Sequence, residues 1–182
     1  MVRRPLVASL ALLPGLGCFA DTGLNELQIT QLFEIKAAVT AGCILGSGSS
    51  DVTTYGSINF GQVSTLPSDV TRVSTVGNGS IQLQCTPGTS LSIALNAGLN
   101  TASVTGGRYM IKGAETLRYQ LYKDAGYSAV WGDGSNGATA MSLTYSATSG
   151  TQSYPVYARL FAVATMPSAG IYTDTVTVTV TY

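Results

Sequence analysis

Residues 174–182 read DTVTVTVTY and form the most regular stretch of this sequence. Valine and threonine alternate through it, so that Val176, Val178 and Val180 fall on one face of an extended segment and threonines on the other. This period of two predicts a strand with one buried face, and we extend the predicted strand over 171–182. A flat strand of β-branched residues with an uncovered edge tends to aggregate unless another segment pairs with it.

Short alternating segments, separated by turn residues, continue along the rest of the chain. Strands are predicted at 81–85, 91–95, 117–122, 128–131, 141–145 and 154–163, with a further run around 55–60. Turn pairs such as Asn78-Gly79 and Asp133-Gly134 stand between them. Many short strands at this spacing favour a sandwich of sheets over a parallel α/β sheet.

The composition limits the chemistry that the chain can perform. Nine basic and nine acidic side chains occur in 182 residues, and there is no histidine. Histidine-dependent triads, Cys–His pairs and histidine-ligated zinc are therefore excluded. The charged fraction is 10%, and no basic excess is present to neutralise a nucleic acid. The mean hydropathy of +0.27 argues against a disordered chain. Because the residues that most catalytic and metal sites use are absent or few, we expect an all-β protein that is not an enzyme and needs no cofactor or metal.

Residues 1–20 have the pattern of an export signal. Arg3 and Arg4 precede an apolar stretch that is too short for a membrane span, and small residues stand just before Asp21. The pattern predicts a signal peptide cleaved before Asp21. Cleavage before Cys18, as in a lipoprotein, is the alternative.

Two cysteines, Cys43 and Cys85, would remain after this cleavage. Exported chains pass through an oxidising compartment, so the pair predicts one disulfide bond. The bond would close a loop of about 40 residues and stabilise the fold by roughly 3–4 kcal/mol on the chain-entropy model. A metal site built from the two thiols is the alternative, and without histidine it would be a poor one.

The segment that precedes Cys43 also alternates. Its apolar side chains fall at every second position, on one face of an extended segment: Phe33, Ile35, Ala37 and Val39. Glu34, Lys36 and Thr40 fall on the opposite face. The pattern predicts a long strand over 27–41; a helix over 24–38 is the alternative, because several apolar residues there also stand near helical spacing.

Three groups of residues could be interpreted as sites, and each has a simpler structural interpretation. Residues 133–137 resemble the start of a calcium loop, but the acidic ligand expected at its twelfth position is absent and the sequence is typical of a hairpin turn. The paired carboxylates of a glycoside hydrolase could come from Glu115, Asp124 and Asp133, which all stand beside turns. A sugar-binding patch could consist of Tyr122, Tyr127, Trp131 and Tyr145, residue types that are more often buried in a sandwich.

Several longer segments match one known family. They are YGSINFGQV (55–63), GSIQLQCT (79–86), LRYQLYKDAGYSAVWGDG (117–134) and GIYTDTVTVTVTY (170–182). These segments, and the placement of the two cysteines, resemble the spore coat protein U domain, the pilin module of archaic chaperone–usher pili of the Csu type. The similarity runs from about Phe33 to Tyr182.

The resemblance implies an incomplete immunoglobulin-like sandwich over 42–182, which a donor strand from a neighbouring subunit or a chaperone completes. It implies that an arm over 21–41 is the donor strand, inserting Phe33, Ile35, Ala37 and Val39 into a neighbour. The strand at the edge of the groove, which would meet the chaperone, would carry Tyr172, Val176, Val178, Val180 and Tyr182.

The resemblance also implies partners and a location. The partners would be a periplasmic chaperone, an outer-membrane usher and other pilin subunits, with no nucleic acid. The chain would be exported through the periplasm to the surface of a Gram-negative bacterium, as a structural subunit of an adhesive pilus that supports attachment and biofilm formation. A secreted β-sandwich module that binds carbohydrate or another surface, without assembling into a fibre, is the alternative function.

Overall fold

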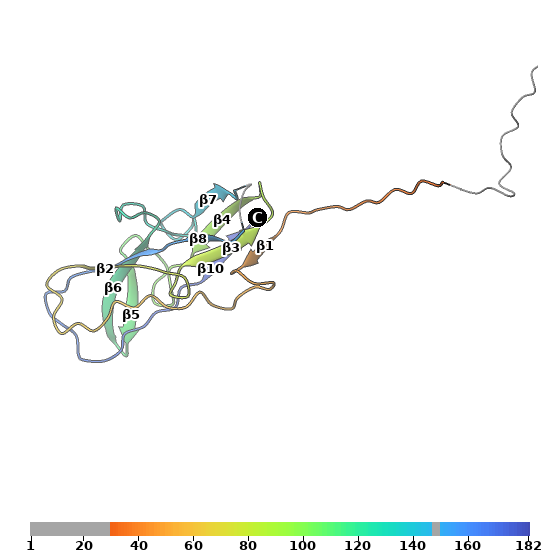
Figure 1. Cartoon of the computed structure of the whole chain (residues 1–182). Helices are drawn as coiled ribbons and strands as arrows, with labels where there is room; N and C mark the ends of the chain where they lie inside the picture. The colour runs from red at the N-terminus through yellow and green to blue at the C-terminus, as the bar shows by residue number, and fades with distance from the viewer. Residues whose placement is uncertain (1–29, 147–149) are drawn as a thin grey trace, which may run out of the picture. The chain divides into compact units, whose positions relative to one another are not determined.

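The computed structural model describes residues 30–146 and 150–182, and within these ranges the regular elements are all strands (Figure 1). The predicted signal peptide and the first part of the arm, to residue 29, lie outside the described residues. Among the described residues, no helix is long and apolar enough to cross a membrane. The all-β fold class predicted from the sequence is therefore confirmed.

Ten strands make up the described fold, and they pair into three antiparallel sheets. Their bounds are β1 Cys43–Leu45, β2 Val70–Val73, β3 Ile81–Cys85, β4 Ser90–Leu95, β5 Arg108–Lys112, β6 Glu115–Tyr122, β7 Met141–Thr144, β8 Gln152–Tyr154, β9 Tyr157–Leu160 and β10 Val178–Thr181. The strand orders are β1-β3-β8, β10-β4-β7 and β2-β9-β6-β5. The strands β1 and β10 thus each stand at the end of a sheet.

Alternation along the strands builds one core that all three sheets share. In β3, Ile81, Leu83 and Cys85 are buried, while Gln84 is exposed. The same period of two buries further residues in the other sheets: Leu91, Ile93 and Leu95 of β4, Leu117, Tyr119 and Leu121 of β6, and Ala158 and Leu160 of β9. A shared core between facing sheets is the defining feature of a sandwich.

Two of the four aromatic residues considered for a sugar patch are fully buried in this core. Trp131 is 0% exposed and donates its indole N–H to the carbonyl of Ile93 at 2.9 Å. Tyr145 is also buried and donates its hydroxyl to the carbonyl of Leu83 at 3.0 Å. The structural interpretation of these rings is confirmed, because neither Trp131 nor Tyr145 can present a surface to a sugar.

One charged side chain, Arg108, is also buried, with 0% of its surface exposed. Its guanidinium donates to the side-chain oxygen of Gln120 at 2.6 Å, to the carbonyl of Asn96 at 2.8 Å and to the carbonyl of Trp131 at 2.7 Å. Burial lowers the pKa of Arg108 from its ordinary value. The hydrogen bonds offset the cost of burying the charge, since a buried donor without a partner is strongly destabilising.

The strands differ from the sequence expectations in several places. The run predicted at 154–163 is split into β8 and β9 around Pro155, because proline has no N–H to donate to a ladder. The run at 128–131 contributes a single bridge, from Val130 to Tyr122, and the run at 55–60 a single bridge, from Gly56 to Asn78. Of the strand predicted over 171–182, only β10 forms. The sequence patterns did not predict the strands β1, β2 and β5.

The described part of the arm also differs from its prediction. Residues 30–41 are exposed and form neither the strand predicted over 27–41 nor the alternative helix over 24–38. A single extended segment leaves its backbone groups without ladder partners, and such a segment gains no strand hydrogen bonds until another strand pairs with it.

The predicted disulfide between Cys43 and Cys85 is confirmed. The two cysteines stand directly opposite each other in the antiparallel pair of β1 and β3. This bond overturns the alternative of a metal site made from the two thiols. The described residues contain no group of three or more cysteine, aspartate or glutamate side chains that could hold a metal ion.

The carboxylates considered for catalysis each bind groups in a neighbouring loop. Asp133 accepts hydrogen bonds from the backbone N–H groups of Ser135 at 2.7 Å and Asn136 at 2.8 Å, which is the turn predicted at 133–137. Asp124 accepts the backbone N–H of Ala129 at 2.7 Å. These hydrogen bonds lower the pKa of Asp133 and of Asp124. Both carboxylates therefore serve to order loops.

Candidate functional site

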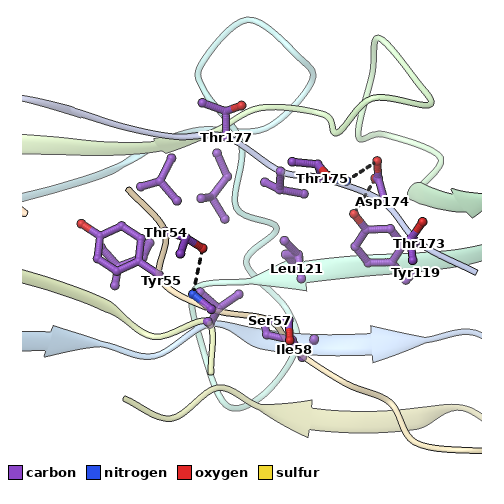
Figure 2. Close-up of a pocket in the computed structure, with 18 of the residues that line it drawn as sticks. Thr54, Tyr55, Ser57, Ile58, Tyr119, Leu121, Thr173, Asp174, Thr175 and Thr177 are labelled. Carbon is purple, nitrogen blue, oxygen red and sulfur yellow. Dashed lines mark hydrogen bonds between the residues drawn. The ribbon is translucent and has the colours of Figure 1, made fainter. Parts of the chain in front are cut away.

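A groove with a volume of about 660 Å³ lies between residues 52–58 and residues 172–178. Figure 2 shows Ser57 and Ile58 on one side of it and Thr175 and Thr177 on the other, with Leu121 between them. The floor is formed by buried apolar side chains from β3, β4 and β6 and from the segment around β9: Ile81, Leu95, Leu121, Val156 and Ala158. The groove therefore opens directly onto the core of the sandwich.

The groove lies between the end strands of two different sheets. Leu45 of β1 and Val178 of β10 both line it. The strand β1 is the end strand of the sheet β1-β3-β8, and β10 is the end strand of the sheet β10-β4-β7. A gap between two sheet ends, with an apolar floor, has the geometry that an additional strand would fill.

The wall at residues 172–178 belongs to a segment that passes from one sheet to another. Thr173 exchanges two backbone hydrogen bonds with Ile111 of β5, at 2.9 and 3.2 Å. Val178 and the following residues of β10 pair with β4. Between these two pairings, Asn96 binds the backbone of Thr177: its N–H donates to the carbonyl at 3.1 Å, and its side-chain oxygen accepts the N–H at 2.9 Å.

The opposite wall, at residues 52–58, is held against the start of β3. The backbone N–H of Gly79 donates to the carbonyl of Tyr55 at 2.7 Å, and the Tyr55 hydroxyl donates to the carbonyl of Gln82 at 3.2 Å. Burial, with a smaller contribution from the charge of Asp51, raises the pKa of Tyr55 to about 12. Gly56 has a φ of +86°, and a side chain there would collide with the backbone of the neighbouring turn. This wall is therefore well fixed although it forms no regular strand.

One end of the groove is bounded by Tyr119 and Asp174, which both line it. The hydroxyl of Tyr119 donates to the carboxylate of Asp174 at 2.6 Å, as the dashed line in Figure 2 shows. Burial is the main cause that raises the pKa of Tyr119, and the hydrogen bond to Asp174 raises it further. At physiological pH the phenol is thus protonated and acts as a donor.

Just beyond this end, the loop that leads into the wall is held by Glu115 of β6. The carboxylate of Glu115 accepts hydrogen bonds from the side chain and backbone of Ser168 and from the hydroxyl of Tyr172, the latter at 3.0 Å. These bonds, with the Ser168 hydroxyl first, lower the pKa of Glu115 to about 2. The ammonium of Lys112 lies 3.6 Å from the same carboxylate.

A family model described as the Spore Coat Protein U domain matches residues 29–179. The chain belongs to the spore coat protein U domain family. The matched range covers all ten strands and the described part of the arm from residue 30 on, apart from the last residues of β10. The resemblance inferred from the quoted segments is thereby confirmed.

Among solved structures, this spore coat protein U domain is similar to two complexes. The first is the CsuC–CsuE chaperone-tip adhesion subunit pre-assembly complex from archaic chaperone–usher Csu pili of Acinetobacter baumannii, at 24% identity and a TM-score of 0.47, covering 79% of this chain and 40% of that chain. The second is a chaperone-tip adhesin complex of CFA/I fimbriae biogenesis, at 18% identity and a TM-score of 0.42, covering 78% of this chain and 42% of that chain. The chain thus spans less than half the length of either. No curated protein matches it significantly.

The groove-edge residues predicted for the spore coat protein U domain are brought together only in part. Tyr172, Val176 and Val178 line the groove and are half-buried. Val180 packs against the core outside the set that lines the groove. Tyr182 is 58% exposed and lines a separate shallow hollow with residues of β4 and β7.

The predicted donor residues are exposed in the described part of the arm. Phe33 is 84% exposed, Ile35 82% and Val39 86%, and Ala37 is also exposed. The ammonium of Lys36 lies 3.1 Å from the carboxylate of Glu34, both on the polar face of the alternating pattern. The donor role of the four apolar residues stays a prediction.

Tyr119 and Asp174 are groove residues for which the sequence patterns predict no site. Tyr119 stands at an inward-facing position of an alternating strand pattern. That pattern does not tell a residue that lines a groove from a residue that is buried in the core. Asp174 carried a clearer signal, because it is a charged residue at a position that the valine–threonine pattern assigns to the inner face. A carboxylate at an inward position requires hydrogen-bond donors around it.

Proposed function

We propose that this spore coat protein U domain is a structural subunit of an adhesive surface pilus, which polymerises when the arm of one copy enters the groove of another. The observation that carries the proposal is the apolar groove between the end strands β1 and β10. The exposed, alternating arm of the same chain supplies a segment of matching character. The role is structural and not catalytic.

The arm fits the groove in length and in period. Residues 33–39 and the wall at 172–178 are equally long, and each spans about 20 Å when extended. In an extended arm, the side chains of Phe33, Ile35, Ala37 and Val39 would all face the apolar floor. A register error of one residue would instead turn Glu34 and Lys36 into the groove, where nothing among its floor residues could neutralise them.

Pairing along the wall would add backbone hydrogen bonds to this apolar contact. When a strand is added to a sheet edge, the backbone supplies affinity and the alternate side chains supply specificity. The acceptor edge would run along Tyr172, Val176 and Val178 and extend to Val180 in the end strand β10, while Tyr182 lines a separate hollow. The small side chain of Ala37, between larger neighbours, would suit a shallow part of the groove and would help to fix the register.

An empty groove is a hazard before assembly, because an apolar surface beside an unpaired strand edge promotes aggregation. We therefore assign the subunit a periplasmic chaperone that fills the groove with its own strand after export. At an outer-membrane usher, the arm of the next subunit would replace the chaperone. The resulting fibre of pilin subunits at the surface of a Gram-negative bacterium would support attachment and biofilm formation.

The test is to express the full chain in a bacterial periplasm, alone and with a pilus chaperone of this class. We expect soluble subunit only with the chaperone, and ladders of polymers on gels when samples are not boiled. A synthetic peptide of residues 30–41 should rescue solubility when it replaces the chaperone, and the same peptide with Ile35→Asp should not. A stable soluble monomer without chaperone or peptide would overturn the proposal and favour the secreted binding module.

A further inference from the structure

Asp174 lies at one end of the groove, where the C-terminal segment passes between sheets. Its carboxylate is surrounded by donors from separate parts of the chain. It accepts hydrogen bonds from the hydroxyl of Tyr119 at 2.6 Å, the backbone N–H of Leu99 at 2.9 Å, the side-chain amide of Asn100 at 3.0 Å and the backbone N–H of Thr175 at 2.9 Å. Hydrogen bonds to an ionised acceptor are about twice as strong as those between neutral groups.

The loop beside Asp174 is shaped around this carboxylate. Gly98 has a φ of +88°, and a methyl group added there would collide with the Asp174 side chain. Asn100, the second donor of that loop, also donates to the carbonyl of Tyr109 in β5 at 2.8 Å. Through its carboxylate, Asp174 therefore connects the loop after β4 with β6 and, by way of Asn100, with β5.

These contacts hold the part of the wall that has the fewest ladder bonds. Thr173 pairs with β5, and regular pairing with β4 resumes only at Val178. Asn96 already holds the backbone of Thr177, so residues 174–176 are the stretch between the two pairings, next to the apolar floor of the groove. Without a fixed point there, the hydrophobic effect would favour collapse of this stretch onto the floor, which would close the site that a donor strand needs.

We propose that Asp174 is a positioning residue that keeps this wall of the groove apart from the floor until a donor strand arrives, with Tyr119 as its principal partner. The inference rests on the proposed function, because it concerns how the acceptor groove stays open. Once the donor is in place, its own side chains fill the floor, and the wall no longer depends on Asp174. Asp174 thus controls donor capture more than the stability of the filled domain.

The test is a capture experiment with the full chain. The chain, with its disulfide intact, is unfolded in guanidinium chloride and diluted into a series of concentrations of a fluorescent peptide of residues 30–41. Gel filtration measures the fraction recovered as soluble peptide complex. The variants are Asp174→Asn and the milder Tyr119→Phe, which keeps the ring at the end of the groove and removes only the hydroxyl. Asp133→Asn and Tyr154→Phe are matched controls, because Asp133 and Tyr154 make comparable hydrogen bonds outside the groove.

We expect Asp174→Asn to raise the peptide concentration for half-capture about tenfold and Tyr119→Phe to raise it about threefold, which suits the loss of hydrogen bonds to a charged acceptor. The controls should leave it unchanged, and the captured complexes of both variants should melt close to the parent complex. A lower yield at every peptide concentration with an unchanged half-capture concentration would show a merely structural role and overturn the inference. If the parent chain captures the peptide and both variants have the parental half-capture concentration, the inference is overturned but the proposed function is not. If the parent chain captures no peptide, the proposed function is overturned together with the inference.

Discussion

Replacing Ile35 with aspartate should abolish polymerisation while leaving the sandwich intact. Ile35 is 82% exposed in the free chain, so the domain loses little when it is changed. In an occupied groove the same side chain would be buried over the apolar floor, and burial of an isoleucine contributes about 1.5–3 kcal/mol. The new carboxylate would also meet only apolar floor residues, which adds a desolvation cost of several kcal/mol.

The transfer contribution alone, at about 3 kcal/mol, corresponds to roughly a hundredfold loss of affinity at each joint of the fibre. The assay is the ladder of polymers on unboiled gels, together with the amount of subunit bound to chaperone. Thr40→Asp is the matched control, since it adds the same charge to the polar face of the arm and should polymerise like the parent. Polymerisation of the Ile35→Asp chain at the parental level would refute the argument that the arm is the donor strand.

Three further predictions concern the stability of the domain, measured by denaturant unfolding with the fluorescence of the single tryptophan. Replacing Cys43 and Cys85 together with serine should lower the free energy of unfolding by about 4 kcal/mol, because the bond spans 42 residues of sequence; an unchanged midpoint would contradict this. Arg108→Met should lower the free energy of unfolding by about 3 kcal/mol or more, since it removes the guanidinium donor from the backbone carbonyls of Asn96 and Trp131, and a loss below 1 kcal/mol would count against it. The hydrogen bonds from Ser168 are the main cause of the lowered pKa of Glu115, and a lowered pKa of a carboxyl group adds to the free energy of unfolding. This contribution is fully present above about pH 4.5, the ordinary pKa, and is lost as the pH falls through about 2, the pKa in the folded chain. Glu115→Gln should remove this contribution from the dependence of the free energy of unfolding on pH. The same pH dependence in the variant and the parent would refute the prediction.

Much of the fold could be predicted because several strands have one clearly buried face. The strands β3 and β4 alternate cleanly, and β6 alternates up to Tyr119 before its last residues are all buried. The predicted positions of these three strands agree with the structure to within two residues. The strand β5 was missed because it begins at Arg108, whose charged side chain occupies an inward position that a sequence pattern assigns to solvent. The run containing Pro155 could have been divided in advance, since proline has no N–H to pair.

The candidate site was less predictable than the strands. A groove is defined by the relation between segments far apart in sequence, here residues 52–58 and 172–178, and no local pattern reports that relation. The C-terminal stretch illustrates the limit. Its alternation correctly identified Val176 and Val178 as inward residues, but it could not indicate that pairing switches sheets between Thr173 and Val178.

The position of the disulfide has a mechanical consequence for a fibre in which the arm connects successive subunits. Tension along the arm reaches the domain at Cys43, the first residue of β1, and β1 is only three residues long. Hydrogen bonds of so short a strand, loaded one after another, would peel apart under modest force. The covalent bond to Cys85 would instead transmit the load into β3, which lies in the middle of its sheet and has three buried core residues, Cys85 among them. Such a fibre would therefore bear shear through the core of each subunit rather than through its weakest edge.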